Sequence, residues 1–251
     1  LRLVGSEMCI RDSQVTLYEA SDKLGGNMRL AAYPPGKGDI TNMIRSYIVR
    51  CQKAGVTIKM NQEVTLDLIR EEKPDSVIVA SGSRTLILPI EGIDNPAIIH
   101  GSDLLDGKRA AGKKVLVVGG GMVGCETAAF LGEQNHDVTV IEFRNTVGAD
   151  VIHEHRVYLM KDFEDYKIKE ITGAKVCKFY EDGVEYETAD GQRHESRGYD
   201  SVILSMGFRN YNPFGEEIKV IVPDTYVIGD ATRARRALDA TKEAYEVAST
   251  L

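Results

Sequence analysis

Two segments of this chain repeat each other, and the repeat limits the fold more than any other feature. Val15–Glu19 matches Val138–Glu142, and Asp75–Gly82 matches Asp200–Gly207, at offsets of 123 and 125 residues. Each copy reads as a β-branched strand that ends in glutamate, with a later strand that runs into Ser-Gly or Ser-x-Gly. Matched segments at nearly one offset indicate two copies of one architecture. The pattern is typical of an α/β unit that binds a dinucleotide.

The second copy carries a complete glycine fingerprint. A buried strand is predicted over 113–118 and a helix over 125–133, and the residues between them fit G-x-G-x-x-G. Gly119 allows the tight turn, Gly121 lets a pyrophosphate approach the backbone, and Gly124 lets helix and strand pack closely. The helix N-terminus offers N–H groups and a positive dipole end to the phosphates.

An acidic residue stands where this motif needs one. Glu142 ends the next predicted strand, 18 residues after Gly124. Its carboxylate can accept hydrogen bonds from both ribose hydroxyls and would repel a 2′-phosphate, which favours NAD over NADP. Arg144 could instead serve a 2′-phosphate, or it could be a solvated surface charge.

The corresponding glycine fingerprint of the first copy would begin before the first residue of the chain. Subtracting 123 from Gly119 and Gly124 gives positions −4 and 1. We therefore expect that the first βα unit is missing, that residues 1–12 are a non-native tail, and that the chain is a fragment.

Further strands are predicted elsewhere in the chain. The residue types indicate a strand pair over Val56–Val64, a buried strand over Ser76–Ala80 and a β meander over Val176–Glu187.

A second candidate ligand position lies near the C-terminus. Tyr226–Ile228 reads as a strand that enters Gly229-Asp230, and a helix is predicted over Leu238–Leu251. An aspartate at the carboxyl end of a parallel strand points into the ligand crevice. Alone, such an aspartate would more simply be a helix cap or turn residue.

Four segments carry a resemblance to a known group: Leu17–Asn27, Pro34–Gly38, Gly119–Thr127 and Tyr226–Ala231. They resemble the two-dinucleotide-binding flavoprotein reductases, in which an NAD(P) domain interrupts an FAD domain. The resemblance is closest to the C-terminal half of 2-enoate reductase, which belongs with 2,4-dienoyl-CoA reductase and trimethylamine dehydrogenase, the multidomain relatives of old yellow enzyme. In that group an N-terminal barrel carries FMN, an iron–sulfur cluster and the substrate site, so the resemblance implies that these lie outside the 251 residues.

The resemblance also implies roles for residues of the FAD-type domain. Glu19 would hold the adenosine ribose of FAD, and Asp230 would bond its ribitol, with the helix that follows aimed at the flavin. The remaining positions would bring backbone near the cofactor: Gly25 and Gly26 at the pyrophosphate, Val64 at the adenine, and Ser81, Gly82 and Gly229 at the turns beside it.

Composition excludes several classes of function. The net charge of −7 argues against a nucleic-acid surface, and no apolar run approaches the ~18 residues of a membrane helix. We therefore expect a cytoplasmic protein. Cys9, Cys51, Cys125 and Cys177 form no C-x-x-C pair, and His153 and His155 lack a third ligand nearby. We expect neither a redox disulfide nor a metal site.

These observations predict an α/β chain with two Rossmann-like domains, the NAD domain inserted in the FAD domain. The FAD-type domain is placed at 13–108 and 208–251, and the NAD(P)-type domain at 109–207. The module would pass hydride from NAD(P)H to FAD, without a catalytic side chain, and feed electrons to the absent barrel, which reduces activated C=C bonds. A stand-alone NAD(P)H-dependent FAD reductase for a protein acceptor and a non-catalytic nucleotide-binding fragment remain alternatives. Expected partners are NAD(P)H and the barrel in cis, and a homo-oligomer stays open.

Overall fold

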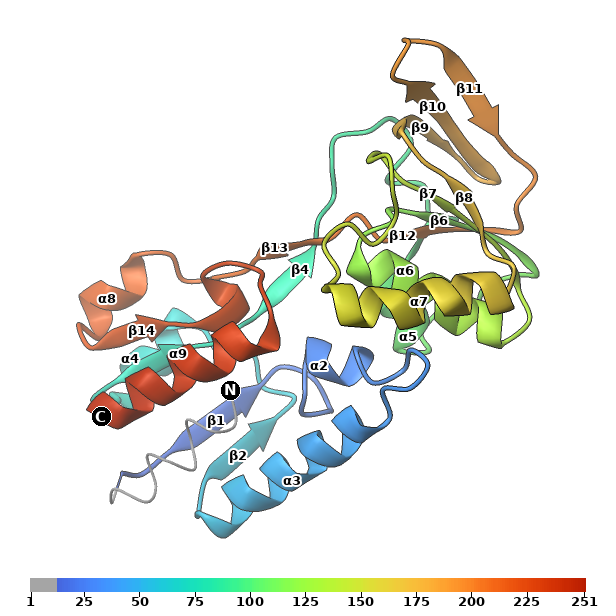
Figure 1. Ribbon diagram of the computed structural model, residues 1–251. Helices are drawn as coiled ribbons and strands as arrows, with labels where there is room; N and C mark the ends of the chain where they lie inside the picture. The colour runs from blue at the N-terminus through green and yellow to red at the C-terminus, as the bar shows by residue number, and fades with distance from the viewer. Residues whose placement is uncertain (1–12) are drawn as a thin grey trace. The chain divides into compact units, whose positions relative to one another are not determined.

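The computed structural model describes residues 13–251, which form two compact units (Figure 1). The first unit comprises residues 13–32, 39–84 and 208–251, and the second comprises 33–38 and 85–207. The later boundary coincides with the predicted one at Gly207. The earlier boundary lies at Arg84 and not at Lys108, because β5 (Ile99–His100) pairs with a strand of the second unit and α5 (Gly101–Leu105) follows it there. The predicted non-native tail, 1–12, lies outside the described residues.

The second unit is built on a five-stranded parallel sheet in the order β5-β12-β6-β7-β8. Its central strand β6 (Lys114–Val118) continues through the glycine turn into α6 (Met122–Glu133), which runs back along the sheet. The other strands of the sheet are β7 (Asp137–Ile141), β8 (Lys169–Ile171) and β12 (Ser201–Leu204).

Side-chain alternation along β6 places two cores on opposite faces of this sheet. Val115 and Val117 pack with α6 and with α7 (His153–Asp165), whereas Leu116 and Val118 pack with the antiparallel strands beyond. Residues 115–118 are at most 1% exposed because both faces are covered (Figure 1). This burial explains the continuous apolar run in the sequence.

The predicted β meander is confirmed as an antiparallel three-stranded sheet in the order β11-β10-β9. Phe179 and Val184 from this sheet contribute to the core under the parallel sheet. Its strands are β9 (Ala174–Tyr180), β10 (Gly183–Thr188) and β11 (Arg193–Ser196).

The first unit holds its parallel strands as two separate pairs, β1 with β2 and β14 with β3. The predicted strand pair over Val56–Val64 is wrong. A single strand, β2 (Thr57–Met60), is followed by Asn61, which takes a left-handed conformation (φ 55°) and ends it. The other members of the two pairs are β1 (Thr16–Glu19), β3 (Val77–Val79) and β14 (Thr225–Val227).

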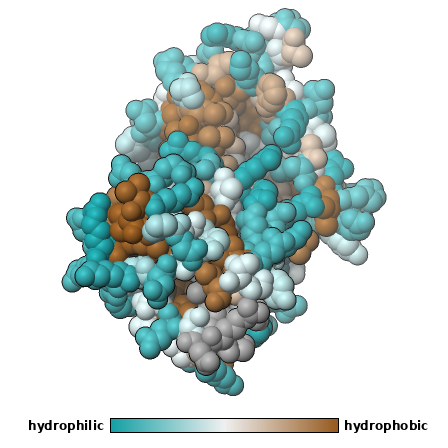
Figure 2. All heavy atoms as spheres, turned by 90° about the vertical axis from the view of Figure 1, so that its left-hand side faces the viewer, coloured by the Kyte–Doolittle hydropathy of each residue, from teal (hydrophilic) through white to brown (hydrophobic). Residues whose placement is uncertain are grey.

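Helices cover both faces of the β14–β3 pair. Ala244 and Ala248 of α9 pack against Ile228 on one side, and Ile69 and Ile218, from α4 and α8, pack against Val79 on the other. Figure 2, which views the left side of Figure 1, shows apolar patches that remain at the surface there. The further elements of the unit are α2 (Asn27–Leu30), α3 (Asp39–Lys53), α4 (Leu66–Glu72), β4 (Ser83–Thr85), β13 (Phe208–Asn210), α8 (Glu217–Ile221), η1 (Gly229–Ala231) and α9 (Ala237–Thr250).

The repeat in the sequence corresponds to a repeat in the sheets. By sequence, β1 matches β7 and β3 matches β12. In the second unit both β7 and β12 pair with β6. Among the described residues of the first unit, no strand pairs with both β1 and β3. The predicted α/β class is confirmed in both units, and the strand that would correspond to β6 has no counterpart in the described part of the first unit.

No helix within residues 13–251 is long and apolar enough to cross a membrane.

Candidate functional site

The glycine turn of the second unit brings three backbone segments into very close approach. Gly119 takes a left-handed conformation (φ 106°), and a Cβ atom there would lie 2.3 Å from the carbonyl oxygen of Ser205. A Cβ atom on Gly124 would lie 1.8 Å from the carbonyl oxygen of Gly119. Only glycine fits either position, so helix α6 begins directly against the carboxyl end of β6. This is the cradle that the fingerprint predicts for a pyrophosphate.

Glu142 stands at the edge of the same turn, directly after β7. Its carboxylate accepts hydrogen bonds from the backbone N–H groups of Gly120, at 2.6 Å, and Arg144, at 2.9 Å. These two bonds fix the carboxylate beside the glycine turn. The cradle and the acid therefore fit an adenosine dinucleotide, and the selection of NAD by Glu142 stays a prediction.

The N-terminus of α6 has a partner that no sequence pattern indicated. Gly121 is the N-cap residue and supplies no side chain, and the backbone N–H of Met122 donates to Asp150 Oδ1 at 3.0 Å. A Cβ atom on Gly121 would lie 3.3 Å from the other carboxylate oxygen. The carboxylate of Asp150 thus lies at the position where helix N–H groups bind anions.

A buried charge lies one turn further along α6. The Glu126 side chain is 7% exposed, forms an ion pair with Lys37, and lies 3.4 Å from His155 Nε2. Both partners are far away in sequence, so no local pattern indicated them. Nearby, Tyr33 meets the ring of Phe130 edge-on, with centroids 6.4 Å apart.

The first unit brings together residues from three of its segments. Ser83 Oγ donates to Asp230 Oδ2 at 3.0 Å and accepts from Asn27 Nδ2 at 3.1 Å. The other oxygen of Asp230 accepts from the backbone N–H of Arg235 at 3.0 Å. Asp230 was predicted as a cofactor ligand, whereas Ser83 and Asn27 were not. Because they follow the predicted Ser81-Gly82 and Gly25-Gly26 turns, those turns were the available signal.

The predicted glycine turns have the conformations that glycine favours. Gly25, Gly26 and Gly82 have φ angles of 131°, 50° and 79°. Gly82 O accepts from the backbone N–H of Tyr211 at 3.0 Å, and the hydroxyl of Ser81 also bonds the Tyr211 carbonyl. Hydrogen bonds to Tyr211 therefore hold the Ser81-Gly82 turn in place beside the candidate site.

The other predicted flavin-site residues lie in the same unit. Glu19 accepts from the backbone N–H of Ser21 at 2.9 Å and from its hydroxyl at 2.8 Å. Gly229 donates its N–H to Glu243 at 2.7 Å. Val64 is half-buried against the core formed by Ile69 and its neighbours. Asp230 lies within the short 3₁₀ turn η1, and α9 begins at Ala237, one residue before the predicted start of that helix. Cofactor contacts of all these residues stay predictions.

In residues 13–251, Cys51, Cys125 and Cys177 are present as thiols. Burial raises the pKa of the Cys125 thiol from 9.0 to about 12, which leaves it protonated and unreactive. Within the same residues no group of three or more His, Cys, Asp or Glu side chains could hold a metal ion.

Comparison with known proteins places this geometry in a family. The family model of pyridine nucleotide-disulphide oxidoreductases matches residues 10–248. The chain belongs to this family. Its members are NAD(P)H-dependent flavin oxidoreductases that bind FAD and NAD(H), and this chain is a module of that kind.

Several similar proteins are larger than this chain. Over 245 residues the chain is 31% identical to cinnamate reductase of Clostridium sporogenes, covering 96% of this chain and 36% of that protein. Over 247 residues it is 32% identical to NADH oxidase of Thermoanaerobacter brockii, covering 95% and 37%. It superposes on the structure of 2-naphthoyl-CoA reductase with a TM-score of 0.93 and 29% identity, covering 100% and 38%. The chain spans little more than a third of each relative, and the predicted resemblance to the C-terminal half of the enoate reductase group is confirmed.

Proposed function

We propose that this chain is the NAD(P)H-oxidising module of a larger flavin-dependent reductase. It would take hydride from NAD(P)H in the second unit, hold FAD in the first, and deliver electrons to an attached domain with FMN and an iron–sulfur cluster. When bound, the cofactors supply the redox chemistry, and the protein supplies binding, orientation and electrostatics. The glycine cradle of the second unit, with Glu142 fixed beside it, is the observation that carries the proposal.

Different residues of the second unit would bind different parts of the dinucleotide. The three successive glycines at 119–121 give the pyrophosphate a stretch of backbone without side chains. Glu142, held by two N–H groups, accepts from the ribose hydroxyls and disfavours a 2′-phosphate by like-charge repulsion. We therefore propose NADH as the preferred donor.

The residues of the first unit would bind FAD. Asp230 has one oxygen bonded to Ser83 and the other to a backbone N–H, so its carboxylate is fixed before a ligand arrives. A fixed acceptor favours one orientation of a ribitol hydroxyl, because little side-chain entropy remains to be lost. Glu19, at the end of β1, is proposed to hold the adenosine ribose in the way that Glu142 does in the second unit.

The two strand pairs of the first unit support an additional βα unit. In the second unit, β7 and β12 flank β6, which leads into the glycine turn. We propose that a strand, glycine turn and helix equivalent to β6–α6 insert between β1 and β3 in the complete protein and bind the FAD pyrophosphate.

The final electron acceptor is proposed from the relatives. Cinnamate has a C=C bond activated by a carboxylate, and 2-naphthoyl-CoA has an aromatic system activated by a thioester. Both names belong to proteins of which this chain covers only 36% and 38%. We propose that the complete protein reduces an unsaturated bond activated by a carbonyl group, in a barrel domain linked in cis.

Binding and flavin reduction test this proposal separately. The 251-residue chain is titrated with NADH, NADPH and FAD, and binding is followed by calorimetry. NADH should bind without FAD, and Gly121→Val should abolish this binding because the side chain fills the cradle. With FAD supplied in excess, anaerobic NADH should bleach the flavin absorbance. A chain that binds neither dinucleotide would overturn the proposal.

A further inference from the structure

The anion position at the start of α6 is already taken by a side chain of the protein itself. Met122 N–H, the first N–H of the helix, donates to Asp150 Oδ1 at 3.0 Å. Helix α6 is 12 residues long, and the dipole and free N–H groups of such a helix favour an anion at this end. A pyrophosphate bound at the glycine turn needs the same N–H groups.

The loop that carries Asp150 is held firmly against the glycine turn. Gly148 donates its N–H to the carbonyl oxygen of Gly120 at 2.7 Å. On either side of Asp150, Val147 and Val151 are buried in the core shared with α6. The anchored backbone of this loop therefore places the carboxylate of Asp150 at the N-terminus of α6.

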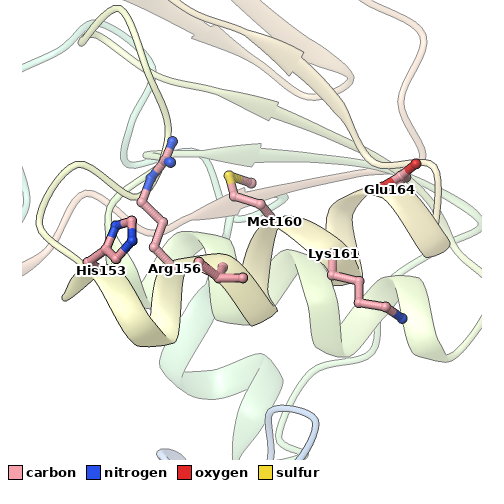
Figure 3. A pocket seen from close by; sticks show the side chains of 6 residues that line it. His153, Arg156, Met160, Lys161 and Glu164 are labelled. Carbon is pink, nitrogen blue, oxygen red and sulfur yellow. The ribbon is translucent and has the colours of Figure 1, made fainter.

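A second tie to this loop comes from α7. Arg156 Nη2 donates to Thr146 Oγ1 at 2.9 Å and to the carbonyl oxygen of Val147 at 3.2 Å. Figure 3 shows Arg156 extending from the first turns of α7, close to His153. The guanidinium is thus engaged with the loop that precedes Asp150. The negative charge of Asp150 faces the helix N-terminus.

We infer that Asp150 is an internal competitor for the pyrophosphate, a carboxylate that the dinucleotide must displace from the N-terminus of α6. This inference rests on the proposed binding of NAD(H) at the same turn. Asp150 is exposed, so rotation about its own side-chain bonds can release it into solvent while the loop stays in place. The residue would moderate dinucleotide affinity and promote release of the oxidised product.

Charge determines how large the effect is. A pyrophosphate and a carboxylate that approach the same N–H groups repel each other, and the carboxylate also takes a hydrogen bond that the ligand needs. Solvent weakens the repulsion because the side chain is exposed. We expect Asp150→Asn to tighten the binding of NADH roughly tenfold, a change of about 1.4 kcal/mol.

The test compares ligands with and without phosphate. Dissociation constants of NADH, ADP, AMP and adenosine are measured calorimetrically for the 251-residue chain and for Asp150→Asn, at low and high salt. The gain should be largest for NADH and ADP, smaller for AMP, absent for adenosine, and reduced at high salt. Glu154→Gln removes another exposed acid four residues away and should leave all four constants unchanged.

Each alternative gives a different pattern. If Asp150 only caps α6, Asp150→Asn leaves every constant unchanged, and the inference is overturned. If Asp150 bonds the cofactor directly, the variant binds NADH more weakly, which also overturns it. An equal gain in Glu154→Gln would assign the effect to net charge and refute a local competition. If neither the parent chain nor the variant binds NADH or ADP, the proposed dinucleotide site itself fails, and the inference with it.

Discussion

Replacement of Gly124 by alanine would test how the glycine turn holds α6 against the sheet. A Cβ atom at this position would lie 1.8 Å from the carbonyl oxygen of Gly119 and 2.8 Å from its carbonyl carbon. Ordinary contact begins near 3.4 Å, so helix and turn would have to separate by about 1.6 Å. Neither moves easily. The N–H of Gly119 is bonded to Ile141 at 2.9 Å, and the next helix residue, Cys125, is fully buried.

This geometry gives a magnitude. Added groups in a packed interior typically cost about 1–3 kcal/mol, and a backbone carbonyl cannot rotate away as a side chain can. We therefore expect Gly124→Ala to lower the free energy of unfolding of the second unit by about 3 kcal/mol, the upper end of that range. At roughly 2–4 °C per kcal/mol, its melting midpoint should fall by about 6–12 °C. Affinity for NADH should fall as well, because the turn that cradles the pyrophosphate opens.

Calorimetric melting and an NADH titration measure the two effects. Gly38→Ala is the matched control, because a Cβ atom there meets nothing within 4 Å and the backbone is not left-handed. It should change stability by less than about 0.5 kcal/mol. A Gly124→Ala chain that melts with the parent and binds NADH equally well would refute the close approach of α6 and β6.

Further expectations concern the cofactors and the thiols. Glu142→Ala should reduce the preference for NADH over NADPH at least about tenfold in titrations, and equal affinities in the parent chain would contradict the role of this acid. Asp230→Ala should lower FAD retention, measured by flavin absorbance after gel filtration, and leave NADH binding intact. Placing a strand, a G-x-G-x-x-G turn and a helix before Val15 should raise flavin content above that of the 251-residue chain, and a parent already saturated with FAD would argue against a missing unit. Iodoacetamide at a pH of about 8 should spare Cys125 and modify the half-buried Cys177. Because the folded-state pKa of Cys125 is raised from 9.0 to about 12, its contribution to stability is full below pH 9 and is lost as pH rises toward 12, by at most about 1.4 kcal/mol per pH unit.

The sequence predicts the second unit well because its constraints are local. Close approach of α6 and β6 demands glycine at fixed spacing, and burial on both faces of β6 demands an apolar run. Each constraint leaves a visible pattern within a few residues. The strand pair over 56–64 was predicted wrongly. Asparagine takes the left-handed conformation more readily than most residues, but the residue type alone does not say at which asparagine a strand ends, and here Asn61 leaves only β2.

The residues that the sequence did not predict belong to contacts between distant segments. Lys37 reaches Glu126 across 89 positions, and Ser83 reaches Asp230 across 147. Asp150 lies in a loop with no motif of its own, and its place beside Met122 depends on the path of the chain around the turn. Such pairs could be identified only after the fold had brought the segments together.

The division of the first unit around the second has a consequence for how the protein is made. Strand β3 pairs with β14, whose residues lie almost 150 positions later in the chain. All strands of the second unit lie between them. During synthesis β3 must therefore wait until the whole inserted unit has left the ribosome, whereas the inserted sheet can form as soon as β12 emerges. We expect the second unit to fold first and to bring the two halves of the first unit's chain to adjacent exit points, because the N–H of Leu86 bonds the carbonyl oxygen of Gly207 at 2.9 Å. Folding of the inserted unit would thus shorten the loop that closes when β14 finds β3, and so reduce the entropic cost of that step.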